Sequence, residues 1–365
     1  MNNFRKLNIQ SATGRCDQSI FYKSSTLLLC FLVILFTISS ALAQETKSVT
    51  IKLGHPDNET DLIKSTYLAY TSVFKRLVEA QTRFKVQIFP SGQLGDLRSM
   101  AEQVSRGVIE MSSGQNGGLL ASFDPNMQIL EMPYTFQTTE TGRIVLNGSF
   151  GKDLSNELAA KSNIRILSYL PSSFRNFSNS KREIKTPADM KGLKMRTMQV
   201  PIHLEMVKAL GASPTPISFE ELYSALQTGV VDGQENAPYV VLMAKLQEVQ
   251  KFYTLDHHLL NTGLTIINDK FYKGLSSEER RVFEYASREA AMALLGLVAA
   301  KESQDIKEIE KAGVKVYTPT PAEYEQFKQA TKDPVLKVMK EKVEAKWIDR
   351  LYKAIEGAEK QVGQR

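Results

Sequence analysis

Hydrophobic and polar residues follow two alternating periods along the chain after residue 44. The run 49–53 alternates with period two, as a half-buried strand does, and 62–80 carries apolar residues at helical spacing. A second strand is predicted at 85–89, a helix at 97–106 and a short strand at 109–112. Strands that alternate with helices predict an α/β fold with a mostly parallel sheet and helices on its faces.

Further strands and helix boundaries are predicted in the second half of the chain. The strand-like runs are residues 164–168, 193–198 and 264–267. Pro201 suits the first turn of a helix that ends before Gly211. Ser218 and Glu221 have the spacing of a capping box, which predicts that a helix opens there.

The longest predicted helix begins after Ser276, which has the capping-box spacing to Glu279. From there to Gly313 the chain has no proline, and its one internal glycine is Gly296. At 1.5 Å per residue, a helix of thirty-odd residues is about 45 Å long, so it could cross two lobes. Thr320 begins a further capping box.

The first 43 residues have the pattern of a secretory signal peptide. Four basic residues precede an apolar run at 27–38, and an A-x-A site ends at Ala43. An uncleaved membrane anchor is the alternative, although a run of about twelve apolar residues is short for a membrane span. We therefore expect export and cleavage after Ala43.

Charge and cysteine content narrow the class of protein. The leader holds four of the 46 Lys and Arg residues and one of the 40 Asp and Glu residues, so the remaining chain has 42 basic against 39 acidic groups. These charges are interspersed and form no basic stripe, which argues against a nucleic-acid partner. Both cysteines, Cys16 and Cys30, lie in the leader. The mature chain therefore has no disulfide, no thiol nucleophile and no Cys-based metal site, and it suits the periplasm or the cell exterior.

Catalytic motifs are absent from the sequence. There is no HExxH, GxSxG or P-loop pattern, and no metal or cofactor is predicted. His257 and His258 follow Asp256, but neighbouring side chains of a strand point to opposite faces, so surface or hydrogen-bonded core roles are favoured over metal ligation. The many carboxylates form no recognisable acid–base set, and an enzyme is not supported.

Arg196 is the first candidate for a ligand-binding residue, because it lies near the end of the predicted strand 193–198. Ligands of parallel α/β sheets bind beyond the carboxyl ends of strands. Arginine keeps its charge when partly desolvated, and its planar fork matches a carboxylate. An exposed surface arginine is the alternative. His55 also follows a strand, 49–54, and is a candidate for the same cleft or for a structural hydrogen bond.

Several motifs resemble those of the DctP-type solute-binding proteins of TRAP (tripartite ATP-independent periplasmic) transporters. They are FPSGQLGDLRSM (89–100), EMPYTF (131–136), KTPADMKGLKMR (185–196), LGASPTP (210–216) and ALQTGVVDGQEN (225–236). The resemblance implies a two-lobe periplasmic-binding-protein fold of type II-like topology, with crossing hinge strands and a long lobe-spanning helix. We expect lobe I at 44–172 plus 261–300 and lobe II at 173–260 plus 301–365.

The resemblance also implies a function and a set of ligand-binding residues. The family captures small organic acids in a cleft and delivers them to a small and a large membrane subunit for ion-gradient-driven uptake, and a monomer is expected. Arg196 takes the place of the family's carboxylate-binding arginine, and Arg175 that of its second cleft arginine. Asn236 corresponds to the ligand-bonding asparagine and Phe219 to an aromatic ring that stacks on the ligand.

Two further polar residues are expected to position the rest of the ligand, and one motif departs from the family. Gln115 and Asn116 would supply donors and acceptors, although some members have an acid near Gln115. Ala237 separates Asn236 from Pro238, where the family often reads QENP. Two alternatives stay open: the binding protein of an ATP-driven importer, and a secreted two-lobe hydrolase or lyase.

Overall fold

The computed structural model describes residues 48–57 and 66–363. Residues 49–365 form one compact unit. The predicted signal peptide, residues 1–43, lies outside the described residues. Among the described residues, no helix is both long enough and apolar enough to cross a membrane.

Nine strands of the described residues form one mixed sheet, in the order β2-β1-β3-β8-β4-β7-β5-β6 with β9 beside β8. The strands are β1 (Val49–Gly54), β2 (Phe84–Phe89), β3 (Met111–Gln115), β4 (Ile164–Asn179), β5 (Lys194–Thr197), β6 (Ser213–Pro216), β7 (Gly233–Asn236), β8 (Phe252–Asn268) and β9 (Lys315–Tyr317). The pairs β1–β2, β1–β3, β5–β6, β5–β7 and β8–β9 are parallel. The prediction of a mostly parallel sheet is wrong at its centre, because β3–β8, β4–β8 and β4–β7 are antiparallel.

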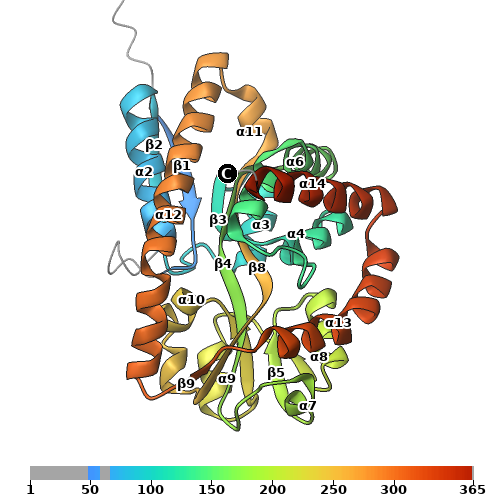
Figure 1. The fold of residues 1–365 in the computed structure, drawn as a ribbon. Helices are drawn as coiled ribbons and strands as arrows, with labels where there is room; N and C mark the ends of the chain where they lie inside the picture. Colours follow the sequence, from blue (N-terminus) through green and yellow to red (C-terminus); the bar gives the residue numbers. More distant parts are fainter. Residues whose placement is uncertain (1–47, 58–65, 364–365) are drawn as a thin grey trace, which may run out of the picture. The chain divides into compact units, whose positions relative to one another are not determined.

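Strands β4 and β8 connect the two halves of this sheet and pair along their full lengths (Figure 1). One end of the pair carries β3, which joins β8 at residues 264–267. The other end carries β7, which pairs with residues 176–179 of β4, and β9, which pairs with residues 252–254 of β8. The pairing shifts register between Ile166 and Ser168, between Pro171 and Ser173, and between Arg175 and Phe177. These are the crossing strands expected of a two-lobe fold.

Helices flank both halves of the sheet. They are α2 (Thr66–Gln81), α3 (Leu97–Arg106), α4 (Gly117–Leu120), α5 (Thr139–Asn147), α6 (Ser149–Ser162), α7 (Pro187–Met190), α8 (Pro201–Ala209), α9 (Leu222–Gln227), α10 (Pro238–Met243), α11 (Asp269–Gly274), α12 (Ser277–Lys311), α13 (Pro321–Lys342) and α14 (Ala345–Gly363), with 3-10 turns η1 (Pro125–Glu131) and η2 (Leu246–Glu248). Figure 1 shows α12 running beside α2 and continuing past α10.

The capping boxes predicted from the sequence start α12 and α13 as expected, whereas the one predicted at Ser218 does not start a helix. The Ser276 hydroxyl accepts from the Glu279 backbone N–H at 3.1 Å, while the Glu279 carboxylate accepts from the Ser276 N–H, and α12 begins at the next residue. Thr320 caps α13 in the same way. The helix predicted after Ser218 is wrong in its start: the Ser218 hydroxyl donates to the side chain of Glu221, so no backbone N–H is capped and α9 starts at Leu222.

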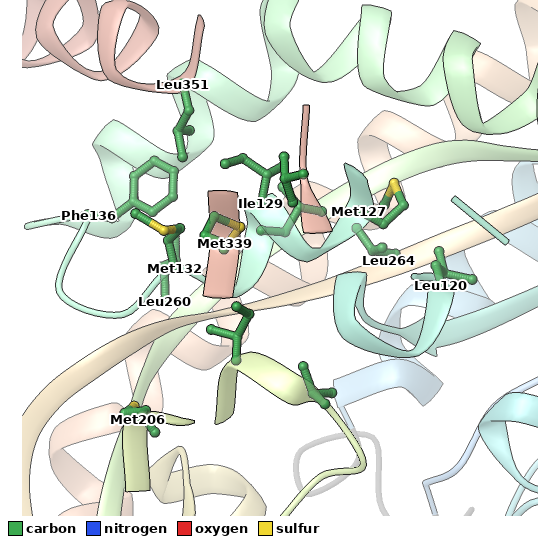
Figure 2. Packing of buried hydrophobic residues seen from close by; sticks show 14 of the residues in the cluster. Leu120, Met127, Ile129, Met132, Phe136, Met206, Leu260, Leu264, Met339 and Leu351 are labelled. Carbon is green, nitrogen blue, oxygen red and sulfur yellow. The ribbon is translucent and has the colours of Figure 1, made fainter. Parts of the chain in front are cut away.

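The largest hydrophobic cluster joins the C-terminal helices to the sheet and to η1 (Figure 2). Its labelled members are Leu120, Met127, Ile129, Met132, Phe136, Met206, Leu260, Leu264, Met339 and Leu351. Helix α14 contributes residues to this cluster and contacts α6. The Trp347 ring of α14 packs edge-on against the Phe150 ring of α6, with 5.6 Å between the ring centroids. Helix α14 thus packs against α6. The expected lobe boundaries, with residues 301–365 in lobe II, stay predictions.

Candidate functional site

A pocket lies beside the middle of the β4–β8 pair, where β3, β5 and β7 end. It encloses about 700 Å³ of empty volume, part of it open solvent. Six of the seven residues predicted to bind the ligand line it: Gln115, Asn116, Arg175, Arg196, Phe219 and Asn236. They come from separate segments of the chain, and the ends of strands bring them together, as in other α/β proteins.

Arg196 is buried in the pocket wall with its charge largely uncompensated. The residue is 1% exposed on β5. Its Nε donates to the Ile217 carbonyl at 2.9 Å, its Nη1 has no hydrogen-bond partner, and it forms no ion pair among the residues that the structure describes. Burial lowers the pKa of the guanidinium to about 10. A carboxylate that enters the pocket would supply the missing counter-charge.

Arg175 has a carboxylate partner inside the protein. Its Nε donates to Glu235 Oε2 at 2.5 Å, and Nη2 donates to Glu235 Oε1 and to the Glu235 carbonyl, both at 2.8 Å. Nη1 donates to Asn261 Oδ1 at 3.1 Å. Burial acts to lower the pKa of Arg175, but the charge and hydrogen bonds of Glu235 outweigh it and raise the pKa. Four of the five guanidinium N–H groups are thus engaged, and one remains for a ligand.

A buried polar network extends from Glu235 away from Arg175. His258 Nε2 lies 3.2 Å from Glu235 Oε2, and its Nδ1 lies 3.0 Å from Asp256 Oδ2. Burial acts to lower the pKa of His258, but the two carboxylates raise it to about 9. His203 Nε2 lies 2.8 Å from Glu131 Oε2, and the pKa of His203 is raised for the same reason against the effect of burial. With a pKa of about 9, His258 is a cation at neutral pH.

The pKa values of Glu235 and Glu131 are lowered although both carboxylates are buried. Burial acts to raise the pKa of Glu235, but Arg175 and the two histidines hold that pKa well below its usual range. The pKa of Glu131 is lowered against burial by His203 and by the Gly118 backbone N–H, which donates to Glu131 Oε1 at 2.9 Å. The hydrogen bonds to Glu235 and Asn261 hold Arg175 in one position.

The remaining predicted residues give the pocket polar and apolar walls. The Gln115 Nε2 donates to the Leu97 carbonyl at 2.7 Å, which leaves Oε1 buried without a partner. Asn236 Nδ2 donates to Gln234 Oε1 at 2.6 Å. Asn116 caps α4, accepting from the Leu119 N–H at 2.9 Å. Phe219 contributes an apolar surface.

His55 is not among the residues that line the pocket. It is fully buried at the end of β1, and neither ring nitrogen has a hydrogen-bond partner in the described part of the chain. Burial lowers its pKa to about 4, so the ring is neutral at pH 7. Among residues 48–57 and 66–363, the ring has no hydrogen bond and does not line this pocket, and the role of His55 stays a prediction.

Sequence patterns did not single out five polar residues of the pocket. Asp57, Tyr67, Glu131, Tyr239 and Asn261 line it with the predicted set. Asp57 accepts from the Tyr67 backbone N–H at 3.0 Å, and Asn261 donates to the Tyr239 hydroxyl at 2.8 Å. Two of these residues could have been found from the sequence. Glu131 is the first residue of the EMPYTF motif, and Asn261 is a polar residue within the otherwise mostly apolar middle of β8.

The histidines and acids of the described residues form no cluster arranged to hold a metal ion. His258 is instead fixed between Asp256 and Glu235, with the Phe177 ring stacked on it at 4.3 Å between centroids. His257 is exposed on the same strand.

The model of the DctP family, bacterial extracellular solute-binding protein family 7, matches residues 61–342. The chain belongs to this family. The 2,3-diketo-L-gulonate-binding periplasmic protein YiaO of Escherichia coli (strain K12) is 35% identical to this DctP-family chain over 286 residues, which are 78% of this chain and 84% of that protein.

Solved structures of TRAP solute-binding proteins have the same fold. A TRAP periplasmic solute-binding protein from Polaromonas sp. JS666, bound to D-erythronate, is 32% identical, with a TM-score of 0.77 over 84% of this chain and 98% of that one. The sugar-acid-binding protein DctPAm from Advenella mimigardefordensis, in complex with galactonate, is 27% identical, with a TM-score of 0.80 over 86% and 99% of the two chains. The two-lobe α/β fold predicted for the DctP-family chain is confirmed.

Proposed function

We propose that this DctP-family protein is the periplasmic solute-binding subunit of a TRAP transporter and captures a small organic acid through Arg196. One observation carries the proposal: a buried arginine in a polar pocket has no carboxylate partner among the described residues, while the second pocket arginine already has one. The ligand carboxylate is the natural counter-ion, since a partly desolvated arginine gains most from a bidentate acid.

The proposed mechanism is closure of two lobes around the acid. Pocket residues come from both halves of the sheet, with Gln115 at the end of β3 and Arg196 on β5. Strands β4 and β8 connect the halves and line the pocket near the middle of their pairing. An acid that contacts both halves stabilises the closed form, whose surface differs from that of the open form. Membrane subunits would recognise that difference, and no covalent step is needed.

The proposal includes export and a membrane partner. Residues 1–43 would direct the chain to the periplasm and be removed after Ala43. The protein would work as a monomer, without cofactor or metal, and pass its ligand to a small and a large membrane subunit. The named relatives support this assignment, because YiaO and the Polaromonas protein are described as periplasmic, and two relatives were solved with D-erythronate or galactonate bound.

The test is a thermal-shift screen of residues 44–365 against organic acids, sugars and amines. A ligand that binds only the native state raises the melting temperature. We expect at least one acid to raise it, and Arg196→Met to abolish the rise while the ligand-free protein stays folded. Arg281→Met, at an exposed arginine of α12 that lines neither this pocket nor the hollow beside it, is the control and should keep the rise. Binding of an uncharged sugar or an amine in preference to every acid, or full binding by Arg196→Met, would contradict the proposal.

A further inference from the structure

A second hollow adjoins the central pocket at Arg196. It encloses about 460 Å³ of empty volume, part of it open solvent. Four residues line both spaces: Leu97, Arg196, Met198 and Phe219. Three of the other residues that line the hollow are exposed: Asp96, Gln199 and Glu220. The hollow therefore leads from solvent to the pocket wall in which Arg196 is buried.

Segments from both halves of the sheet face each other across this hollow. Arg98 lies in the first turn of α3, which packs beside β3. Glu220 lies in the connection between β6 and α9, close to β5 and β7. Closure of the two halves would bring these two segments together. Charges placed on them can therefore favour closure without touching the acid.

Arg98 is a half-buried cation whose position nothing else explains. Its guanidinium forms no hydrogen bond or ion pair with the residues that the structure describes. The helix dipole disfavours a positive charge in the first turn of α3. The nearby Asp96 serves as the N-cap of α3, where its Oδ1 accepts from the Ser99 N–H at 2.7 Å. Helix stability therefore does not account for an arginine at this position.

Glu220 is the carboxylate of the hollow that is not engaged. Its neighbour Glu221 accepts from the Ser218 hydroxyl at 2.8 Å, whereas the Glu220 side chain has no hydrogen bond or ion pair within 48–57 and 66–363. Burial lowers the pKa of Arg196, and the negative charges of Glu235 and Glu220 act against that change. Glu220 thus interacts electrostatically with Arg196, although no hydrogen bond joins the two side chains.

We infer that Arg98 and Glu220 form an ion pair across the hollow when the two halves close on an acid, and that this pair retains the acid without contacting it. This inference rests on the proposed function and adds two positioning residues to the same site. Without an acid, the uncompensated Arg196 attracts Glu220. A ligand carboxylate on Arg196 cancels that attraction. Arg98 is then the cation of the hollow, in the described part of the chain, that still lacks a carboxylate.

A double-mutant cycle on residues 44–365, measured by isothermal titration at neutral pH and low salt, tests the inference. The probe is the tightest-binding acid of the thermal-shift screen, in which D-erythronate, galactonate, glucuronate and succinate are included. Arg98→Gln should raise the Kd about threefold, since exposed ion pairs change an equilibrium by up to about fivefold. Glu220→Gln should also raise the Kd. The product of the two single changes should exceed the change in the double variant by about threefold, because the pair is lost only once.

Three further readouts distinguish an ion pair from a structural role. The difference in Kd between Arg98→Gln and the unsubstituted protein should disappear in about 1 M NaCl, where the Debye length is about 3 Å. The melting temperature without acid should be the same in both proteins, since the pair forms on closure. Glu278→Gln/Arg281→Gln removes the same charges at exposed positions of α12 that line neither space, and it should keep the Kd.

The outcomes separate the inference from the proposed function. Single changes that simply multiply in the double variant overturn the inference while acid capture through Arg196 stands. Tighter binding by Glu220→Gln also overturns it, because Glu220 would then only compete with the acid for Arg196. An Arg98→Gln effect that persists unchanged in high salt overturns it as well. Failure of every acid in the screen overturns the proposed function and the inference with it.

Discussion

Raising the pH from 6 to 9 should destabilise the protein by deprotonating His258. This imidazole is fully buried between Asp256 and Glu235, which raise its pKa from the unfolded value of about 6.5 to about 9. A folded pKa above the unfolded one means that the stabilisation is complete below pH 6.5 and is lost as the pH rises through 9. His203, with its own raised pKa, acts in the same direction.

The magnitude follows from the two pKa values of His258. Each unit of difference corresponds to about 1.4 kcal/mol, so the free energy of unfolding should fall by about 2 kcal/mol between pH 6 and 8 and by about 3 kcal/mol by pH 9. The assay is urea unfolding at 25 °C, followed by circular dichroism and by the fluorescence of the single tryptophan, Trp347, which is buried on α14.

Two variants separate His258 from other groups that titrate. His258→Gln should be less stable at pH 6 and should lose most of the decline between pH 6 and 9, because glutamine has no proton to release. His257→Asn, at the exposed neighbouring position, should keep the decline. A free energy of unfolding that stays constant to within about 1 kcal/mol from pH 6 to 9, or an equally steep decline in His258→Gln, would refute the reasoning.

Three further predictions concern other parts of the structure. Gly118→Ala should weaken acid binding by about tenfold in calorimetry. A Cβ at residue 118 would lie 2.3 Å from Val200 Cγ2 and would keep α4 from approaching the connection between β5 and α8. Unchanged affinity would argue against this contact in the bound form. His55 is neutral when folded, with a pKa of about 4, so stability should fall by about 2 kcal/mol from pH 6.5 to 5, and urea titrations of His55→Gln should show a shallower decline over that range. Ser276→Ala should cost about 1 kcal/mol in urea unfolding through loss of the α12 cap, whereas Ser122→Ala, at an exposed serine that caps no helix, should cost less.

Much of the fold could be predicted because its boundaries are marked by local chemistry. The capping residue Ser276 begins α12, and the absence of proline lets the helix run to Lys311, as expected from the sequence. The length of β4 could not be predicted, because residues 171–179 combine Pro, Ser, Asn and Arg with no clear period. These polar side chains are buried in the centre of the sheet, where partners such as Gln250 for Ser178 and Tyr253 for Asn176 are distant in sequence.

Pocket residues that belong to sequence motifs could be predicted, whereas ion pairs between residues distant in sequence could not. Arg196 and Asn236 line the pocket from positions that their motifs suggested. The engagement of Arg175 by Glu235 could not be inferred, since the two residues are 60 positions apart and meet through the β4–β7 pairing. Glu235 stands beside Asn236 in the DGQEN motif, but only the strand register places its carboxylate against the guanidinium.

The most direct test of the central claim is a crystal structure of residues 44–365 with the acid that binds most tightly in the screen. Acid capture through Arg196 predicts that both carboxylate oxygens lie within about 2.7–3.0 Å of the Arg196 guanidinium nitrogens, with Arg175 still paired to Glu235. A carboxylate bound elsewhere, with Arg196 making no contact to the acid, would contradict the account.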